Sequence, residues 1–213
     1  MQKQSTVQLR INHSQYQQDI FSDSCFSYYC TARFSGLFFY AMKRLLLVRH
    51  AKSDWENREL KDFDRPLNKR GNKNAPEMAR RLLKKDLIPQ LLVSSPALRA
   101  LTTAEYFAEE MGIDKSSIIK RPEIYEASSS TLLSVINSLD NRYGFVALFG
   151  HNPGLTNLAV NLCNCDVYNI PTCGVMLINF PFDDWQMISY WTGDQKLYDF
   201  PKNVEAERYE END

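Results

Sequence analysis

Two arginines and two histidines stand out in this sequence as residues that can do chemistry together. Arg49 and His50 are adjacent, Arg99 lies near the middle of the chain, and His151 follows a glycine. Guanidinium groups bind phosphoryl oxygens through directed, charge-assisted hydrogen bonds. A neutral imidazole can act as a nucleophile and carry a covalent intermediate. The four residues therefore predict a site for phosphoryl transfer.

The charges in such a site would set the protonation of its imidazoles. Two nearby guanidinium cations should lower the pKa of His50 below the reference value of about 6.5, which keeps the ring unprotonated near neutrality. A protonated His151 would add a donor to the transferred oxygens. Charge stabilisation and positioning would supply most of the rate enhancement. The arginines would stabilise the charge of the phosphoryl group, as a metal ion does in other phosphoryl-transfer enzymes. We therefore expect no metal and no cofactor.

Each candidate residue comes after a short apolar run that is typical of a buried strand. The three runs are Leu45–Val48, Leu91–Val93 and Phe145–Phe149. In open parallel sheets, ligands bind outside the carboxyl ends of the strands. The pattern therefore predicts that the residues after the three runs meet at one edge of one sheet.

Helical patterns separate the predicted strands. Asn74-Ala75-Pro76-Glu77 has the order of an N-terminal cap, and Ser95-Pro96 is typical of a cap followed by the first helical residue. Residues 128–139 and 155–162 have apolar side chains at helical spacing. This alternation predicts a three-layer α/β/α fold, with a mostly parallel sheet and helices on both faces.

The last part of the chain predicts a hairpin at the edge of the sheet. Val175–Phe180 and Trp185–Trp191 are strand-like and are joined by Pro181-Phe182-Asp183-Asp184. We expect one or both of these strands to run antiparallel.

The two ends of the chain differ from its middle. Residues 1–41 are rich in Gln and Ser, poor in acidic residues and without a sustained period. We expect either a disordered extension or a start assigned upstream of a true start at Met42. Residues 42–202 form the predicted domain, and residues 203–213 form a polar tail.

The composition limits the class of protein. Of 213 residues, 44% are apolar, which is enough for a core, and no apolar run approaches the roughly 20 residues that span a bilayer. A balance of 25 basic and 26 acidic residues argues against a nucleic-acid or membrane-surface binder. Five cysteines, an odd number, argue against a disulfide framework, so we expect a cytoplasmic location. The sequence leaves the oligomeric state open.

The motifs around these residues resemble those of the histidine phosphatase superfamily, which has the phosphoglycerate-mutase-like fold. Residues 47–53 (Leu-Val-Arg-His-Ala-Lys-Ser) resemble its Arg-His signature, residues 94–104 its second arginine motif, and residues 150–154 its second histidine motif. Residues 65–71 also fit. The resemblance runs from Met42 to about Lys202. The Arg-His-Ala-Lys-Ser start, the His-Asn-Pro-Gly motif and the short length indicate the SixA-type phosphohistidine phosphatase branch.

The resemblance implies a role for each of the four residues. His50 would be the nucleophile that becomes phosphorylated. Arg49, Arg99 and His151 would bind and stabilise the phosphoryl group.

Further candidates are less closely tied to the motifs. Many family members carry a glutamate that protonates the leaving group, and the family pattern places Glu126 there, with Glu123 as the alternative. The hydroxyl of Ser53 and the ammonium of Lys52 could add phosphate contacts, with ordinary loop polarity as the alternative for both. Asn152 could contribute a backbone or side-chain donor.

Three functions are compatible with these residues. The first is a metal-independent phosphatase, acting on a phosphohistidine-bearing protein through a phosphohistidine intermediate. The second is a phosphatase or mutase of small phosphorylated metabolites. A mutase generally needs a segment that closes over its substrate, and residues 114–143 have room for one loop and one helix. The third is a phosphate-binding module without turnover, which would have no need of His50.

Overall fold

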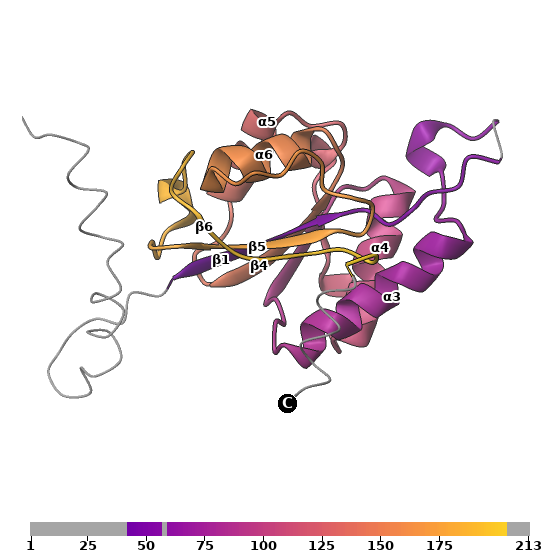
Figure 1. Ribbon diagram of the computed structural model, residues 1–213, viewed down its shortest axis with the longest axis horizontal. Coiled ribbons are helices and arrows are strands. Elements are labelled where there is room, and N and C mark those ends of the chain that lie inside the picture. Colours follow the sequence, from indigo (N-terminus) through magenta and orange to yellow (C-terminus); the bar gives the residue numbers. More distant parts are fainter. Residues whose placement is uncertain (1–41, 57–58, 204–213) are drawn as a thin grey trace, which may run out of the picture. The chain divides into compact units, whose positions relative to one another are not determined.

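The computed structural model describes residues 42–56 and 59–203 (Figure 1). The predicted extension, residues 1–41, lies outside the described residues, as does the predicted tail beyond residue 203. No helix in the described ranges is long and apolar enough to cross a bilayer.

The centre of the domain is a six-stranded mixed sheet in the order β3-β2-β4-β1-β5-β6. The first four strands in this order pair in parallel, β5 runs antiparallel to β1, and β6 runs antiparallel to β5. The mostly parallel sheet is therefore confirmed. The strands are β1 (Lys43–Arg49), β2 (Leu91–Ser94), β3 (Ile119–Lys120), β4 (Phe145–Gly150), β5 (Val175–Phe180) and β6 (Asp194–Asp199).

Helices cover both faces of this sheet (Figure 1). One layer contains α3 (Lys69–Lys84) and α4 (Leu98–Glu110), and the other contains α5 (Ser129–Asn137) and α6 (Gly154–Cys163). Successive side chains of β1 alternate between two apolar cores, because side chains along a strand point to opposite faces. Leu46 belongs to the core under α3 and α4, whereas Leu47 belongs to the core under α5 and α6. The predicted three-layer α/β/α architecture is confirmed.

The starts of two helices differ from the prediction. α3 begins at Lys69 rather than near Asn74, because the side chain of Asn68 caps it and accepts the amide of Gly71 at 2.9 Å. Pro76 consequently lies inside the helix. α4 begins at Leu98, after an N-cap at Ala97 without a side-chain hydrogen bond. Ser95 is not the cap of this helix, because it lies three residues before the first helical residue and its hydroxyl accepts the amide of Ala97.

The predicted second strand of the hairpin is wrong. Residues 185–187 form a 3-10 helix, whose start is capped by the side chain of Asp184. Trp185 is fully buried, and its indole nitrogen donates to the carbonyl of Tyr143 at 2.9 Å. The strand that pairs with β5 at this edge is β6, which begins nine residues further along the chain than expected. The antiparallel direction at this edge is as predicted.

The start of α3 packs directly on the loop that follows β1. The amide of Asn68 donates to the carbonyl of Lys52 at 2.9 Å, and Ser53 forms a β-bridge with Leu67. At Gly71 the two backbones approach so closely that a Cβ atom would lie 2.2 Å from the Lys52 carbonyl oxygen. Only glycine fits there without displacing one of the two backbones.

Gly71→Ala should destabilise the fold by about 1–3 kcal/mol, because neither backbone can yield as a flexible side chain would. Urea unfolding measures this change. Gly144→Ala is the matched control, since its nearest contact for a Cβ is a side-chain atom at 3.6 Å. Equal stability of the two variants would contradict this account of Gly71.

Candidate active site

The four predicted residues lie together beyond the carboxyl ends of the parallel strands. Arg49 ends β1 and pairs in register with Gly150 of β4, so His50 and His151 extend from neighbouring strands. Their ring centroids are 5.1 Å apart. Arg99 enters from the first turn of α4, which follows β2. The structure therefore brings all four to one edge of the sheet, as the strand pattern predicts.

The surroundings of His50 leave it neutral with one ring nitrogen available. Its Nδ1 lies 2.8 Å from the carbonyl oxygen of Ala51, which can only accept, so Nδ1 carries the proton. Burial above all, together with the charges of Arg99 and Arg49, lowers the pKa of His50 to about 4, against the effect of the Ala51 hydrogen bond. Nε2 therefore keeps its lone pair at neutral pH and can act as a nucleophile.

His151 is also buried and neutral. Burial, with a smaller contribution from His50, lowers its pKa to about 3. Its Nε2 lies 2.9 Å from the hydroxyl of Ser95, which also accepts the amide of Ala97 at 3.3 Å. The Ser95 hydroxyl has two lone pairs, so its contact with Nε2 fits either neutral tautomer of His151. The sequence allows for a protonated His151 as a donor, whereas the lowered pKa leaves a neutral ring with a single N–H group.

Both arginines are held by oxygen atoms from distant loops. Arg49 donates to the carbonyl of Ile170 at 2.7 Å and to the side chain of Asn169 at 3.4 Å. Arg99 donates to the backbone oxygen of Asp62 at 2.5 Å and to its carboxylate at 2.8 Å. These contacts fix the direction of each guanidinium plane toward the site.

A third arginine, Arg65, belongs to this cluster. It is 7% exposed, stacks on the ring of Trp55 at 3.3 Å and donates to the hydroxyl of Ser53 at 3.0 Å. It also pairs with the carboxylate of Asp62 at 3.3 Å. Arg65 and Asp62 follow no predicted strand, so the rule that selects residues after strands did not select them. The motif at residues 65–71 was the available signal for Arg65.

The site has several hydrogen-bond donors without a partner. Among the described residues, nothing accepts from the buried Nε atoms of Arg49, Arg65 and Arg99, or bonds to Nδ1 of His151. Buried polar atoms are normally paired, and each unpaired one costs about 1–3 kcal/mol. A tetrahedral oxyanion offers several acceptor oxygens together with compensating charge. The arrangement is therefore suited to hold a phosphoryl group against Nε2 of His50.

The two candidate acids lie in the loop before α5. Glu126 is exposed and has a positive φ of 52°, and its neighbour Tyr125 packs edge-on against the ring of His151. Tyr125 also donates its hydroxyl to the carboxylate of Asp62 at 2.9 Å. Glu123 pairs with Arg121 at 3.5 Å at an exposed position. The general-acid role of Glu126 stays a prediction.

Ser53 and Asn152 make contacts within the protein. Ser53 is buried and accepts from Arg65. Asn152 donates to the side chain of Asn169 at 2.8 Å and to the carbonyl of Ile170 at 3.0 Å, the same two residues that accept from Arg49. Both residues therefore position arginines of the site, and their direct contact with phosphate stays a prediction.

Comparisons with known proteins point to one family. A family model described as the histidine phosphatase superfamily, branch 1, matches residues 45–132. An uncharacterized chloroplastic protein of Arabidopsis thaliana is 28% identical over 152 residues, which cover 68% of this chain and 69% of that protein. A solved structure assigned as the phosphohistidine phosphatase SixA of Agrobacterium tumefaciens is 27% identical, with a TM-score of 0.63. That match covers 75% of this chain and 98% of the other.

Two more distant structures share the fold. A protein histidine phosphatase SixA in complex with tungstate has a TM-score of 0.64 at 21% identity, over 76% of this chain and 99% of the other. A mycobacterial glucosyl-3-phosphoglycerate phosphatase has a TM-score of 0.55 at 16% identity, over 74% and 99%. Likeness at these identities confirms the predicted phosphoglycerate-mutase-like fold and carries nothing further.

Acidification should destabilise the fold between about pH 6.5 and pH 4. In the unfolded chain both imidazoles take up protons near their ordinary pKa of about 6.5, but in the fold only near 4 for His50 and 3 for His151. The unfolded state binds more protons in this window. The free energy of unfolding therefore decreases as the pH decreases, by up to about 1.4 kcal/mol per pH unit for each histidine. Urea unfolding at pH 7, 6 and 5 measures the slope.

His151→Gln provides the control for this prediction, because an amide can keep the contact with Ser95 and does not titrate. Its slope should be about half that of the unaltered chain. An identical slope in the two proteins would mean that His151 does not contribute.

Proposed function

This chain belongs to the histidine phosphatase superfamily, and from that premise we propose that it removes phosphoryl groups from histidine side chains of proteins. One observation carries the proposal. A buried, neutral His50 with a free Nε2 lies among three arginines whose Nε donors have no partner among the described residues. A nucleophile and a binding site for the transferred group thus occur together.

The proposed reaction has two steps at phosphorus. In the first, the Nε2 lone pair of His50 forms a bond to phosphorus while the bond from phosphorus to the substrate nitrogen breaks. The leaving imidazole keeps the electron pair of that bond and takes up a proton. The guanidinium groups neutralise the charge on the transferred oxygens, and the hydrogen bond from Nδ1 to Ala51 supports the positive ring of the phosphorylated histidine.

In the second step, a water molecule forms a bond to phosphorus as the bond to Nε2 breaks. Inorganic phosphate leaves, the water gives up a proton, and His50 returns to its neutral form. Because the attacking group and the leaving group both lie in line with phosphorus, the same arginines can stabilise both steps.

The carboxylates near the site favour an N-linked over an O-linked phosphoryl group. Although burial opposes the change, hydrogen bonds from Tyr125 and Arg99 and the charge of Arg99 keep the pKa of Asp62 below its usual value, so it is a poor proton donor near neutrality. Glu126, the predicted donor, is exposed. An alkoxide leaving group needs a positioned acid, whereas an imidazole becomes a good leaving group once it is protonated.

Two further observations support a protein substrate. The similarity to the Agrobacterium tumefaciens protein, at 27% identity over 98% of that chain, favours the SixA-type branch. Between α4 and β4 the chain forms only two short 3-10 helices, the two-residue β3 and the helix α5. This stretch therefore supplies no large segment that could close over a small substrate. A small-metabolite phosphatase is the alternative, and the substrate comparison below separates the two.

The cysteines bear on where this activity would occur. Cys163, Cys165 and Cys173 are free thiols. Free thiols are typical of a reducing compartment, and we propose the cytoplasm. The similar protein of Arabidopsis thaliana is described as chloroplastic.

His50→Ala should lower kcat/KM by at least about a thousandfold, because removal of the nucleophile blocks the first step. Phosphate release is measured from a phosphohistidine peptide, from p-nitrophenyl phosphate and from 3-phosphoglycerate, with EDTA present. The peptide should be the best substrate of the unaltered protein. Rapid acid-free quenching should also trap a base-stable phosphoryl group on the protein and none on His50→Ala.

His13→Ala is the matched control, since His13 is the third histidine of the chain. It should release phosphate at the unaltered rate. Full activity of His50→Ala would remove the proposed mechanism, and a clear preference for 3-phosphoglycerate would replace the proposed substrate class with a metabolite.

A further inference from the structure

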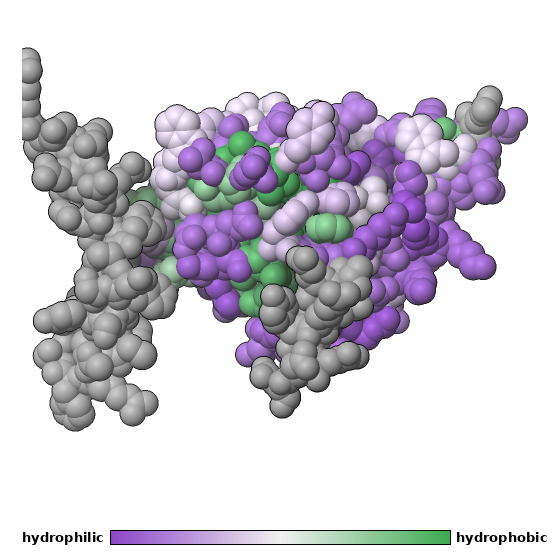
Figure 2. All heavy atoms as spheres, viewed as in Figure 1, coloured by the Kyte–Doolittle hydropathy of each residue, from purple (hydrophilic) through white to green (hydrophobic). Residues whose placement is uncertain are grey.

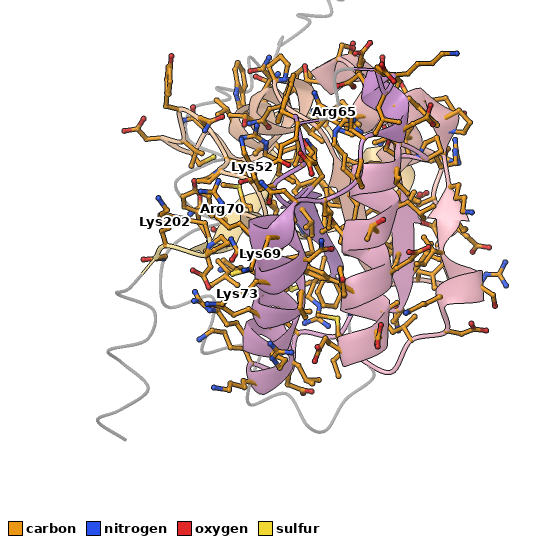
Figure 3. The ribbon with its side chains drawn as sticks, turned by 90° about the vertical axis from the view of Figure 1, so that its right-hand side faces the viewer. Lys52, Arg65, Lys69, Arg70, Lys73 and Lys202 are labelled. Carbon is orange, nitrogen blue, oxygen red and sulfur yellow. The ribbon has the colours of Figure 1, made fainter. Side chains whose placement is uncertain are left out.

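Five cations lie together beside the candidate active site, at the start of α3 (Figure 3). We define this basic face as Lys52, Lys69, Arg70, Lys73 and Lys202. All except the half-buried Lys52 are exposed. They come from three segments of the chain, which are the loop after β1, the first turns of α3 and the turn after β6. In the hydropathy view, strongly hydrophilic residues cover the side of the molecule occupied by α3 (Figure 2).

The composition of the chain does not account for this cluster. The whole chain has 25 basic and 26 acidic residues, so cations and carboxylates are nearly balanced. Elsewhere on α3, Arg80 pairs with Glu110 at 2.6 Å and Arg81 pairs with Glu77 at 2.7 Å. Within residues 42–56 and 59–203, none of the five cations of the basic face contacts a carboxylate.

The positions of these cations do not serve the stability of α3. Lys69 and Arg70 occupy its first turn, Lys73 lies one turn further, and the first turn has no acidic residue. The N-terminus of a helix is the positive end of its dipole, where acidic side chains stabilise and basic ones oppose the dipole. A role in contacts outside the domain explains this placement better than a role in folding.

The basic face is joined rigidly to the site. Lys52 follows His50 by two residues, and its carbonyl oxygen accepts from the amide of Asn68 at 2.9 Å. The close approach of Gly71 to the same carbonyl leaves no room between the loop and α3. Arg65, which belongs to the site, lies next to this junction (Figure 3). The distance from His50 to the cations is therefore set by backbone contacts.

The shape of this surface favours a large partner over a small polyanion. Small ligands bind in concave pockets, where most of their surface is buried. The four exposed cations of the basic face project from the outside of a helix and from the turn after β6, and a cavity of 510 Å³ lies elsewhere, beside α6. Exposed charges spread over a surface are typical of the rim of a protein–protein contact, where they steer association and select partners.

We infer that the basic face docks an acidic protein surface that surrounds the phosphorylated residue of the substrate. This inference rests on the proposed function, because it names the kind of partner that presents its phosphoryl group to His50. The partner would place carboxylates over the start of α3 while its phosphoryl group lies among the arginines.

The test uses two phosphohistidine peptides of equal length, one with glutamates flanking the phosphohistidine and one with glutamines. The full-length protein should hydrolyse the glutamate peptide with about tenfold higher kcat/KM at low ionic strength, because each exposed charge pair changes an equilibrium by about 1.5- to 5-fold. The preference should fall toward unity at about 0.5 M salt, where the screening length is only a few ångströms.

Charge reversal identifies the surface. Lys69→Glu with Lys73→Glu should abolish the preference and leave the rates on the glutamine peptide and on p-nitrophenyl phosphate unchanged. The control is Lys84→Glu with Lys85→Glu, which makes the same charge change at the other end of α3, about 23 Å away. The control should keep the preference. Acidic residues at the start of α3 agree with its dipole, so the first variant should fold.

A binding measurement separates the two proposals. The glutamate peptide is labelled and carries an unphosphorylated histidine. Fluorescence anisotropy measures its binding to the unaltered protein and to both double variants. Binding that Lys69→Glu with Lys73→Glu removes, without phosphate release from any peptide, would uphold the docking surface and overturn the proposed function. Phosphate release at equal rates from both peptides would uphold the proposed function and overturn the docking surface.

Two other outcomes would overturn the docking surface. One is an equal loss of preference in the control at the far end of α3. The other is a faster rate on the glutamate peptide after charge reversal of Lys69 and Lys73. That result would indicate that an acidic segment of the chain itself, such as residues 205–213, occupies the basic face.

Discussion

Arg65 and Arg99 contact the two oxygens of one carboxylate, that of Asp62, and the rest of the site is arranged around this ion-pair cluster. Both guanidinium groups are almost fully buried, whereas the carboxylate is 43% exposed. Buried charges persist only when they are paired and hydrogen-bonded. Asp62 compensates part of the positive charge from the solvent side. The remaining charge makes the interior of the site favourable for an anion.

Burial and this excess of positive charge together govern the two imidazoles. Burial has the larger effect on the pKa of His50 and of His151, and the neighbouring cations lower both values as well, so the two rings stay neutral at physiological pH. Neutrality is what a nitrogen nucleophile needs, and the carbonyl of Ala51 decides which nitrogen of His50 is free. Burial, charge and hydrogen bonding therefore prepare the same atom. The charges that attract a phosphoryl group also help to keep its acceptor nucleophilic.

Backbone contacts relate the interior of the site to the surface around it. The loop after β1 carries His50 on one side and meets the start of α3 on the other, through Asn68 and Gly71. A partner that contacts the exposed cations of α3 is therefore held at a constant distance from the nucleophile. The exposed cations would select the partner, and the buried arginines of the site would bind the phosphoryl group. This arrangement suits the proposed protein substrate.

The sequence by itself determined three strands of the parallel sheet, β1, β2 and β4, and the residues that follow them. Runs such as Leu45–Val48 form strands because they must be buried on both faces, and parallel strands bring their carboxyl ends to one edge. Only the tertiary structure decided that Ile119–Lys120 joins the parallel sheet, that Asp62 joins the site, and that residues 194–199 form the edge strand. These features depend on contacts between segments far apart in the chain, and local periodicity holds no information about such contacts.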